Sequence, residues 1–325
     1  MIIKQIPEDF IVEELINLNL SNGNYSIYKL TKKNWDTFKI LETIARILNT
    51  KIKFIGYAGN KDKKAVTTQY ISFYKIPKNR IDRIKINDVK LEFLGYSPDR
   101  INLGDLKGNK FIITARNLDK KSRLPSELQL ENYFDDQRFG NKSNTHLVGK
   151  AIIKKDFKEA CKLLNLEVKN NDYVGVLRTQ HRRLLRFYIS SYQSYIFNNQ
   201  LSKIISDRKH FLVDYSLGKL NLSAEKIKNF NLPLISFDSK EDNILKEIIK
   251  KENISLNDFI IKQIPELITE TQYREAFIEV KDIKSKFDED ELNKDKFKVI
   301  IEFTLPKGSY ATLLIKKLES YLNQA

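Results

Sequence analysis

The chain is patterned for strands near both ends and for helices in its middle, and this order limits its fold most. The segments TTQYISFYKI (67–76) and NKFIITARN (109–117) predict strands, because β-branched and aromatic residues alternate with other residues in them. Between about 150 and 270, apolar residues more often recur at helical spacing, as in DFKEACKLLNL (156–166). The alternation returns in KVIIEFTLP (298–306). A chain of 325 residues can form two domains, so this order favours a helix-rich domain inserted into a strand-rich one.

Two further segments lie in the strand-rich part. WDTFKILETIARILN (35–49) predicts a helix, with apolar residues at helical spacing from Phe38 onward and Asp36 as its N-cap. The acidic run Asp288–Glu291 predicts a solvated loop rather than a metal site.

The chain carries a large excess of positive charge, with 57 Lys and Arg against 42 Asp and Glu, a formal net charge of +15. This excess favours a polyanionic partner, nucleic acid first, over a role in solubility alone. The single cysteine, Cys161, excludes an internal disulfide and fits a reducing cytoplasm. No signal-peptide core and no membrane span of about 20 apolar residues is visible. We therefore expect a soluble cytoplasmic protein with no membrane partner.

The usual motifs for cofactors and metals are missing from the sequence. Neither a GxxxxGKS or GxxxxGKT loop nor a GxGxxG motif occurs, so no nucleotide cofactor is expected. The three histidines, His146, His181 and His210, are far apart and form no HExxH pattern, so no metal site is expected. Cys161 lies in a predicted amphipathic helix, where a small core residue is a better interpretation than a nucleophile.

The densest group of chemically active residues is GYAGNKDKKAVTTQ (56–69). Small residues precede one carboxylate, Asp62, which stands among Lys61, Lys63 and Lys64. One interpretation is a charged β-turn. The other is a turn that presents an anion in a cleft while the lysines face phosphate, because nearby cations favour an ionised carboxylate.

A second dense segment is NYFDDQRFG (132–140). Its three aromatic residues, two amides and one arginine could stack on a base, bond its edge and contact phosphate. The alternative is an aromatic-anchored loop that ends at Gly140.

Three arginines recur every four residues, at Arg178, Arg182 and Arg186. On one helix they would share a face. That face could bind the phosphate backbone of a nucleic acid, or it could be a solvated basic face.

These motifs together resemble the TruD family of tRNA pseudouridine synthases. AGNKDKKAVTTQ (58–69) resembles the family signature AGxKDxxAVTxQ, and NYFDDQRFG resembles NYFGxQRFG, with Asp135 where glycine is usual. Three further segments resemble family elements in the same order: KQIPEDFIVEE (4–14), LKGNKF (106–111) and LPKGSYATLLIKKL (305–318).

The resemblance implies an α+β pseudouridine-synthase catalytic domain with a mixed, largely antiparallel sheet and flanking helices. Residues 1–149 and 276–325 would form this discontinuous domain, and residues 150–275 an inserted α/β TRUD domain. The family expectation is a monomer that acts on tRNA without a cofactor or metal, at uridine 13 in the D-arm.

The resemblance also implies roles for individual residues. Asp62 matches the catalytic nucleophile, and Lys4 matches a basic position near it that could steady its charge. Phe10, Asn132 and Tyr310 match residues that contact the substrate base. Phe134 would line the same pocket; for Phe10 and Phe134, ordinary core packing is the alternative.

Two other classes of protein share some of these features. A non-catalytic RNA-binding or chaperone protein would have the same charge and aromatic residues but would not need Asp62. A metal-dependent nuclease would need clustered carboxylates, whereas Asp62 has lysines around it in the sequence.

Overall fold

The structure is a computed structural model that describes residues 1–324, and these residues form two compact units. Unit 1 comprises Met1–Leu128 and Val280–Gly308, and unit 2 comprises Gln129–Glu279 and Ser309–Gln324. Within the described residues, no helix has both the length and the apolar character that a membrane span requires.

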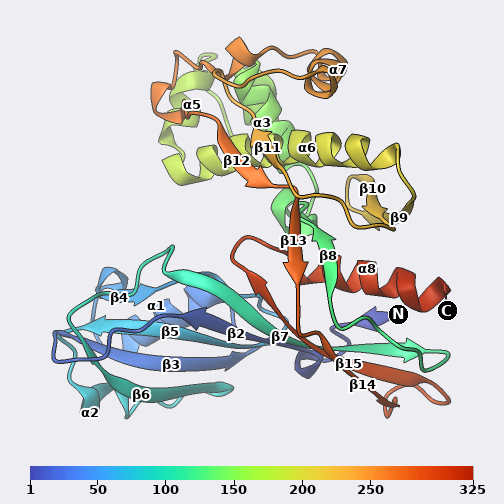
Figure 1. The fold of residues 1–325 in the computed structure, drawn as a ribbon. Coiled ribbons are helices and arrows are strands. Elements are labelled where there is room, and N and C mark those ends of the chain that lie inside the picture. The colour runs from blue at the N-terminus through green and yellow to red at the C-terminus, as the bar shows by residue number, and fades with distance from the viewer. Residues whose placement is uncertain (325) are drawn as a thin grey trace. The chain divides into compact units, whose positions relative to one another are not determined.

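Unit 1 is built on a mixed sheet whose strands follow the order β14-β15-β7-β2-β5-β3-β6, with β1 on β7 and β4 on β5 (Figure 1). The strands are β1 (Ile2–Ile3), β2 (Phe10–Ile16), β3 (Tyr25–Lys33), β4 (Ile55–Tyr57), β5 (Val66–Tyr74), β6 (Val89–Ser97), β7 (Leu106–Leu118), β14 (Lys284–Glu289) and β15 (Phe297–Pro306). The pair β2–β5 is parallel and the other pairs of this sheet are antiparallel. The predicted strands at 67–76, 109–117 and 298–306 correspond to β5, β7 and β15. The α+β fold with a mixed, largely antiparallel sheet is thus confirmed.

The helices of unit 1 are α1 (Thr37–Ile47) and α2 (Lys78–Ile81), with short 3-10 helices η1 (Pro7–Asp9) and η2 (Ile52–Phe54). The predicted N-cap of α1 is confirmed, because the Asp36 side chain accepts a hydrogen bond from Lys39 N. α1 buries Ile40, Leu41 and Ile44 in a core that it shares with residues of β3 and β5. Phe38 was predicted on this apolar face but is 49% exposed. It lies outside the face of the helix that Ile40, Leu41 and Ile44 bury.

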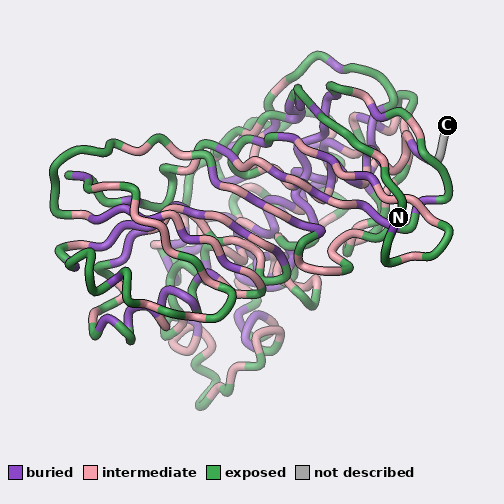
Figure 2. Tube along the Cα trace, turned by 90° about the horizontal axis from the view of Figure 1, so that it is seen from below, coloured by how far each residue is buried: buried purple, intermediate pink, exposed green. Residues whose placement is uncertain are grey.

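Unit 2 is rich in helices. These are α3 (Thr145–Ile153), α4 (Phe157–Leu163), α5 (Tyr173–Thr179), α6 (Arg182–Ser206), α7 (Asn243–Glu252) and α8 (Ala311–Gln324), with 3-10 helices η3 (Asp136–Phe139), η4 (Leu256–Phe259) and η5 (Pro265–Leu267). Three two-stranded sheets accompany them, formed by β8 (Leu128–Glu131) with β13 (Phe277–Val280), β9 (His210–Tyr215) with β10 (Gly218–Ser223), and β11 (Asn231–Leu234) with β12 (Gln272–Glu275). The long helix α6 contributes Leu185, Ile189, Tyr192 and Ile196 to the core of this unit. In Figure 2 the buried residues, in purple, concentrate in the regular elements, while the loops are mostly green.

The limits of the two units differ from the predicted domain limits at 149/150 and 275/276. Residues 129–149 and 309–324 were assigned to the strand-rich domain but pack in unit 2. One reason is a buried ion pair, in which Lys317 Nζ of α8 lies 2.9 Å from Glu131 Oε1 of β8. A compact unit need not coincide with a family domain, so the predicted domain limits stay a prediction.

The acidic run Asp288–Glu291 is not simply a solvated loop. Asp288 and Glu289 end β14 and are exposed, whereas the Asp290 side chain is buried. Asp290 accepts hydrogen bonds from Arg116 Nη1 at 2.8 Å and from Asn117 N at 2.9 Å. The prediction of a fully solvated run was therefore wrong at Asp290, because the partner arginine lies far away in the sequence.

Candidate active site

The loop that carries Asp62 connects β4 to β5 in unit 1, and hydrogen bonds from buried side chains hold it in place. The Thr37 hydroxyl accepts from Lys61 N at 2.9 Å and donates to Gln69 Oε1 at 3.1 Å. Lys32 Nζ donates to the carbonyl of Asp62 at 3.2 Å and to that of Trp35 at 2.6 Å. These contacts hold the backbone on both sides of Asp62.

One of the three lysines next to Asp62 points into the unit. Lys61 Nζ lies 2.7 Å from Glu14 Oε1, and both side chains are buried. Burial raises the pKa of Glu14, although Lys61 opposes this shift. Lys63 and Lys64 are exposed. The expectation that the lysines face phosphate therefore fails at Lys61, which instead anchors the loop to β2.

Lys32 is a component of this site that the sequence interpretation missed. It is only 1% exposed, and burial lowers its pKa to about 8, against the opposing effect of Asp36, Asp62 and Glu14. The sequence did contain a signal for it. Lys32 alternates with Tyr28 and Leu30 along β3, so its side chain lies on the same buried face of the strand. A lysine at an inward-facing strand position indicates a buried polar site.

Lys4 lies beside Asp62, and Phe10 lies under the ammonium group of Lys4. Lys4 Nζ is 2.6 Å from Asp62 Oδ2 and 3.9 Å from the centroid of the Phe10 ring. The backbone of Lys4 is left-handed, with φ of 58°. Phe10 is buried and packs edge-on against Phe111 with the ring centroids 6.1 Å apart. Phe10 thus has core contacts, as its alternative interpretation expected, and a cation above its ring.

Asn132, Phe134 and Tyr310 come together in unit 2. The rings of Phe134 and Tyr310 are 6.3 Å apart and edge-on. Asn132 Nδ2 donates to the carbonyl of Glu275 at 3.0 Å, while its Oδ1 accepts from Arg274 Nη2. The hydrogen bonds therefore fix the orientation of the Asn132 amide.

Two half-buried arginines lie on the Phe134 ring. The guanidinium carbon of Arg274 is 4.2 Å from the ring centroid, and that of Arg138 is 5.2 Å from it. Burial lowers the pKa of Arg274 to about 10 and also lowers the pKa of Arg138. Arg138 belongs to a segment that the sequence singled out. Arg274 lies in β12, outside every motif, and no local signal could have identified it.

Asp135, where the family has glycine, has an ordinary backbone. Its φ of −96° and ψ of −179° are extended, so no glycine is required there. Its buried carboxylate accepts from Lys316 Nζ at 2.9 Å and from the Thr312 hydroxyl, both in α8. With aspartate at this position, hydrogen bonds therefore connect this loop to α8.

The three regularly spaced arginines do not form one helical face. Arg178 belongs to α5, which ends at Thr179, whereas Arg182 and Arg186 belong to α6. Arg178 Nη2 donates to the carbonyl of Gln263 at 2.6 Å, and Arg186 Nη2 donates to that of Glu266 at 2.7 Å. The prediction of a single helix was wrong because the chain turns at positions 180–181; contact of these arginines with tRNA stays a prediction.

The histidines and acidic residues of the described chain form no obvious metal centre. Within residues 1–324, no group of three or more His, Cys, Asp or Glu side chains is arranged to hold a metal ion. Burial lowers the pKa of His146 to about 4, and its ring lies 5.0 Å from that of Tyr195.

Comparison with known proteins identifies one family. A sequence model of tRNA pseudouridine synthase D (TruD) matches residues 1–168 and 231–318. A protein of Methanosarcina acetivorans named as a probable tRNA pseudouridine synthase D is 31% identical, over 97% of this chain and 91% of the relative. A protein of Methanocaldococcus jannaschii with the same type of name is also 31% identical, over 98% of this chain and 91% of the relative. The crystal structure of the protein assigned as tRNA pseudouridine synthase D from Methanosarcina mazei superposes with a TM-score of 0.71 at 30% identity, and covers 97% of this chain and 92% of that one.

Proposed function

Because the chain belongs to the tRNA pseudouridine synthase D (TruD) family, it is a pseudouridine synthase, an isomerase, and we propose that Asp62 is its catalytic nucleophile toward uridine in tRNA. The observation that carries this proposal is the position of the Asp62 carboxylate. It lies 2.6 Å from Lys4 Nζ, on a loop whose backbone is held by the buried residues Thr37 and Lys32. A carboxylate held in this way is preorganised for attack on a substrate.

The reaction needs few groups from the protein. The C1′–N1 bond of uridine breaks, the uracil turns, a C1′–C5 bond forms, and the proton on C5 leaves while N1 gains one. The Asp62 carboxylate either attacks the sugar carbon or removes a sugar proton as the first bond breaks. No redox step or energy-rich nucleotide is needed to balance this isomerisation.

The uracil must leave its stack and be held while it turns. We propose that Asn132 and Tyr310 contact it, with Phe10 and Phe134 lining the site. An amide NH2 has two hydrogens, so Asn132 can donate to Glu275 O and to a uracil carbonyl at the same time. Burial raises the pKa of Tyr310, so its hydroxyl keeps its proton near neutral pH and can donate a hydrogen bond.

We further propose that uridine 13 of the D-arm is the target and that the protein acts as a monomer. The catalytic domain would comprise residues 1–149 and 276–325, and the inserted TRUD domain residues 150–275. The net charge of +15 supports binding to a polyanion.

An assay on unmodified tRNA transcripts tests this function. With tritium at C5 of uridine, every turnover releases the label, and carbodiimide mapping then locates the modified residue. We expect label release in the presence of a chelator and one mapped site, at position 13. Binding without release would instead indicate a non-catalytic RNA-binding protein, and strand cleavage that depends on added metal would indicate a nuclease.

A further inference from the structure

Lys4 lies in a short segment, residues 4–9, that leaves the sheet of unit 1 and returns to the same strand. Before this segment, Ile3 of β1 pairs with Ala115 of β7. After it, Phe10 of β2 pairs with Ile113 of β7. We call residues 4–9 the strap. Six residues therefore stand opposite a single residue of β7, and the strap must be held by contacts other than strand pairing.

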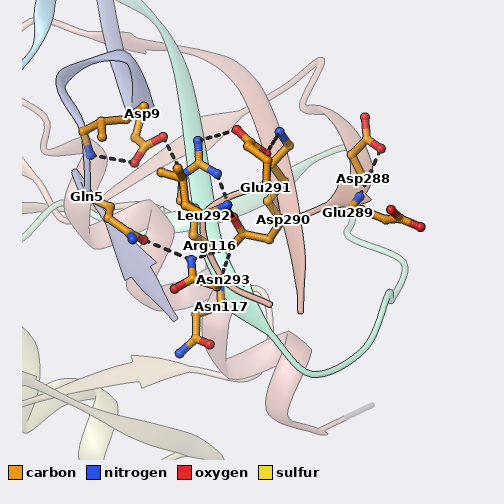
Figure 3. Close-up of polar contacts among 12 residues, drawn as sticks. Gln5, Asp9, Arg116, Asn117, Asp288, Glu289, Asp290, Glu291, Leu292 and Asn293 are labelled. Carbon is orange, nitrogen blue, oxygen red and sulfur yellow. Dashed lines mark hydrogen bonds and ion pairs between the residues drawn. The ribbon is translucent and has the colours of Figure 1, made fainter. Parts of the chain in front are cut away.

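Arg116 of β7 provides such a contact at the far end of the strap from Lys4. Arg116 Nε donates to Asp9 Oδ1 at 2.8 Å, and Ile6 N donates to the other oxygen of Asp9 at 3.0 Å (Figure 3). Both Arg116 and Asp9 are buried. The Asp9 carboxylate thus joins the guanidinium to the backbone of the strap.

The remaining donors of Arg116 bind the hairpin between β14 and β15. Nη1 lies 2.8 Å from Asp290 Oδ1, and Nη2 lies 3.1 Å from Glu291 Oε1 (Figure 3). Burial alone would lower the pKa of Arg116, but its bonds to the three carboxylates raise it. Burial alone would raise the pKa of Asp290, but its hydrogen bonds, among them those from Asn117 and Arg116, lower it to about 2. Arg116 therefore stays charged, and it joins the strap to the hairpin between β14 and β15.

The backbone of Lys4 shows why such anchoring matters. A left-handed residue other than glycine is strained by roughly 1–3 kcal/mol and persists only where its surroundings determine it. Lys4 has this conformation, with φ of 58°. Its ammonium group reaches Asp62 from there, at 2.6 Å. If the strap relaxed, the lysine would adopt a common conformation and its ammonium group would move away from the carboxylate.

We infer that Arg116 is a positioning residue, which acts through Asp9 and the strap to hold Lys4 on Asp62. This inference rests on the proposed function of Asp62. It assigns to Arg116 and Asp9 a role that a purely structural ion-pair cluster would not have.

The variant Asp9→Asn tests this role, with Glu291→Gln as a matched control. Each change removes one carboxylate charge from the Arg116 cluster, but only Asp9 belongs to the strap. Arg116 Nε and Ile6 N donate to different oxygens of Asp9, and asparagine replaces one of these oxygens with an NH2 group, so one of the two donors would face another donor. We expect Asp9→Asn to lower kcat by about 10-fold to 100-fold with little change in KM, as for a displaced catalytic group. Glu291→Gln should leave kcat near that of the wild type.

A double-mutant cycle with Lys4→Met separates positioning from stability. If Asp9 acts through Lys4, Asp9→Asn should lower kcat no further once Lys4 has been replaced. A further loss of the same size in the Lys4→Met background would overturn the inference, and so would equal losses of kcat in Asp9→Asn and Glu291→Gln. Fluorescence of Trp35, the only tryptophan, reports folding of the same unit. If Asp9→Asn does not fold, Arg116→Lys replaces it in the cycle, since a lysine keeps the charge but lacks the fork that bridges carboxylates.

A second readout does not depend on RNA. The rate at which an amine-reactive ester acylates Lys4, measured by mass spectrometry, should rise severalfold in Asp9→Asn and stay near the wild-type rate in Glu291→Gln. An unchanged rate in Asp9→Asn would contradict the positioning role. If the wild type formed no pseudouridine, the proposed function would fail while this measurement still decided the position of Lys4.

Discussion

Replacing Phe134 with alanine should destabilise unit 2 as strongly as the loss of a core residue. Phe134 is 6% exposed and packs edge-on against Phe197, with the ring centroids 5.6 Å apart. Its ring also lies beneath the guanidinium group of Arg274, 4.2 Å away, and near that of Arg138. The change to alanine removes all of these contacts at once.

The expected loss can be estimated from these contacts. Truncation of a buried phenylalanine to alanine costs about 3–5 kcal/mol in unfolding free energy. A desolvated guanidinium on a ring contributes about 2 kcal/mol, and such terms are not additive. Because Arg274 and Arg138 both lose their aromatic partner, we expect a loss near the upper end, about 4–5 kcal/mol. A residue that only lined a substrate pocket would cost far less.

Urea denaturation followed by far-UV circular dichroism measures this loss, since the 25-residue helix α6 lies in the same unit. Phe134→Leu is the matched control, because it keeps most of the apolar volume but removes the ring faces. We expect it to cost about 1–2 kcal/mol, the size of the lost guanidinium–ring interaction. Tritium release, measured well below the unfolding transition, should also fall in Phe134→Ala.

A loss of less than about 1 kcal/mol in Phe134→Ala would refute this reasoning. It would mean that the ring does not support the fold and that its role is confined to the substrate. Equal losses in the alanine and leucine variants would also contradict it. The whole loss would then come from the ring interactions, and none from the buried volume.

Two further predictions concern Lys32 and the arginines of α5 and α6. Burial lowers the pKa of Lys32 from 10.5 to about 8. Its buried charge therefore destabilises the fold below pH 8. Between pH 8 and 10.5 the native state has released this proton, while the unfolded state still holds it. The unfolding free energy of the wild type relative to Lys32→Met should therefore rise over that window, by at most about 3 kcal/mol; urea titrations at several pH values measure this, and a constant difference would contradict it. Arg182→Gln should flatten the log–log salt dependence of the tRNA dissociation constant by about 0.7–0.9 without loss of stability, and an unchanged slope would exclude a phosphate contact. Arg178→Gln and Arg186→Gln should also lower the melting temperature, because both arginines bind loop carbonyls.

The local patterns of the sequence predicted the regular elements of the sheet well. The segments 109–117 and 298–306 lie in β7 and β15, which pair with one another. The cap of α1 and its core face, apart from Phe38, also followed from local rules. Alternation and capping depend on residues near one another in the chain, so a single sequence contains this information.

The parts of the site that could not be predicted depend on contacts between distant residues. Arg274 binds Asn132 across 142 positions, and Arg116 binds Asp290 across 174. No periodicity records such a pairing. The arginine spacing failed for a related reason, since a four-residue period continued across the break between α5 and α6. The family motifs named Asp62 and Lys4, but only the structure showed that buried Lys32 and Lys61 hold the loop of Asp62.

The central claim, that the Asp62 carboxylate carries the reaction, is tested most directly by single-turnover tritium release with Asp62→Asn. Asp88→Asn is the matched control, because Asp88 is exposed in the same unit and undergoes the same chemical change. We expect no release and no mapped pseudouridine with Asp62→Asn, while tRNA binding stays near that of the wild type and Asp88→Asn retains full activity. Pseudouridine formation by Asp62→Asn beyond the trace that deamidation restores would contradict the account.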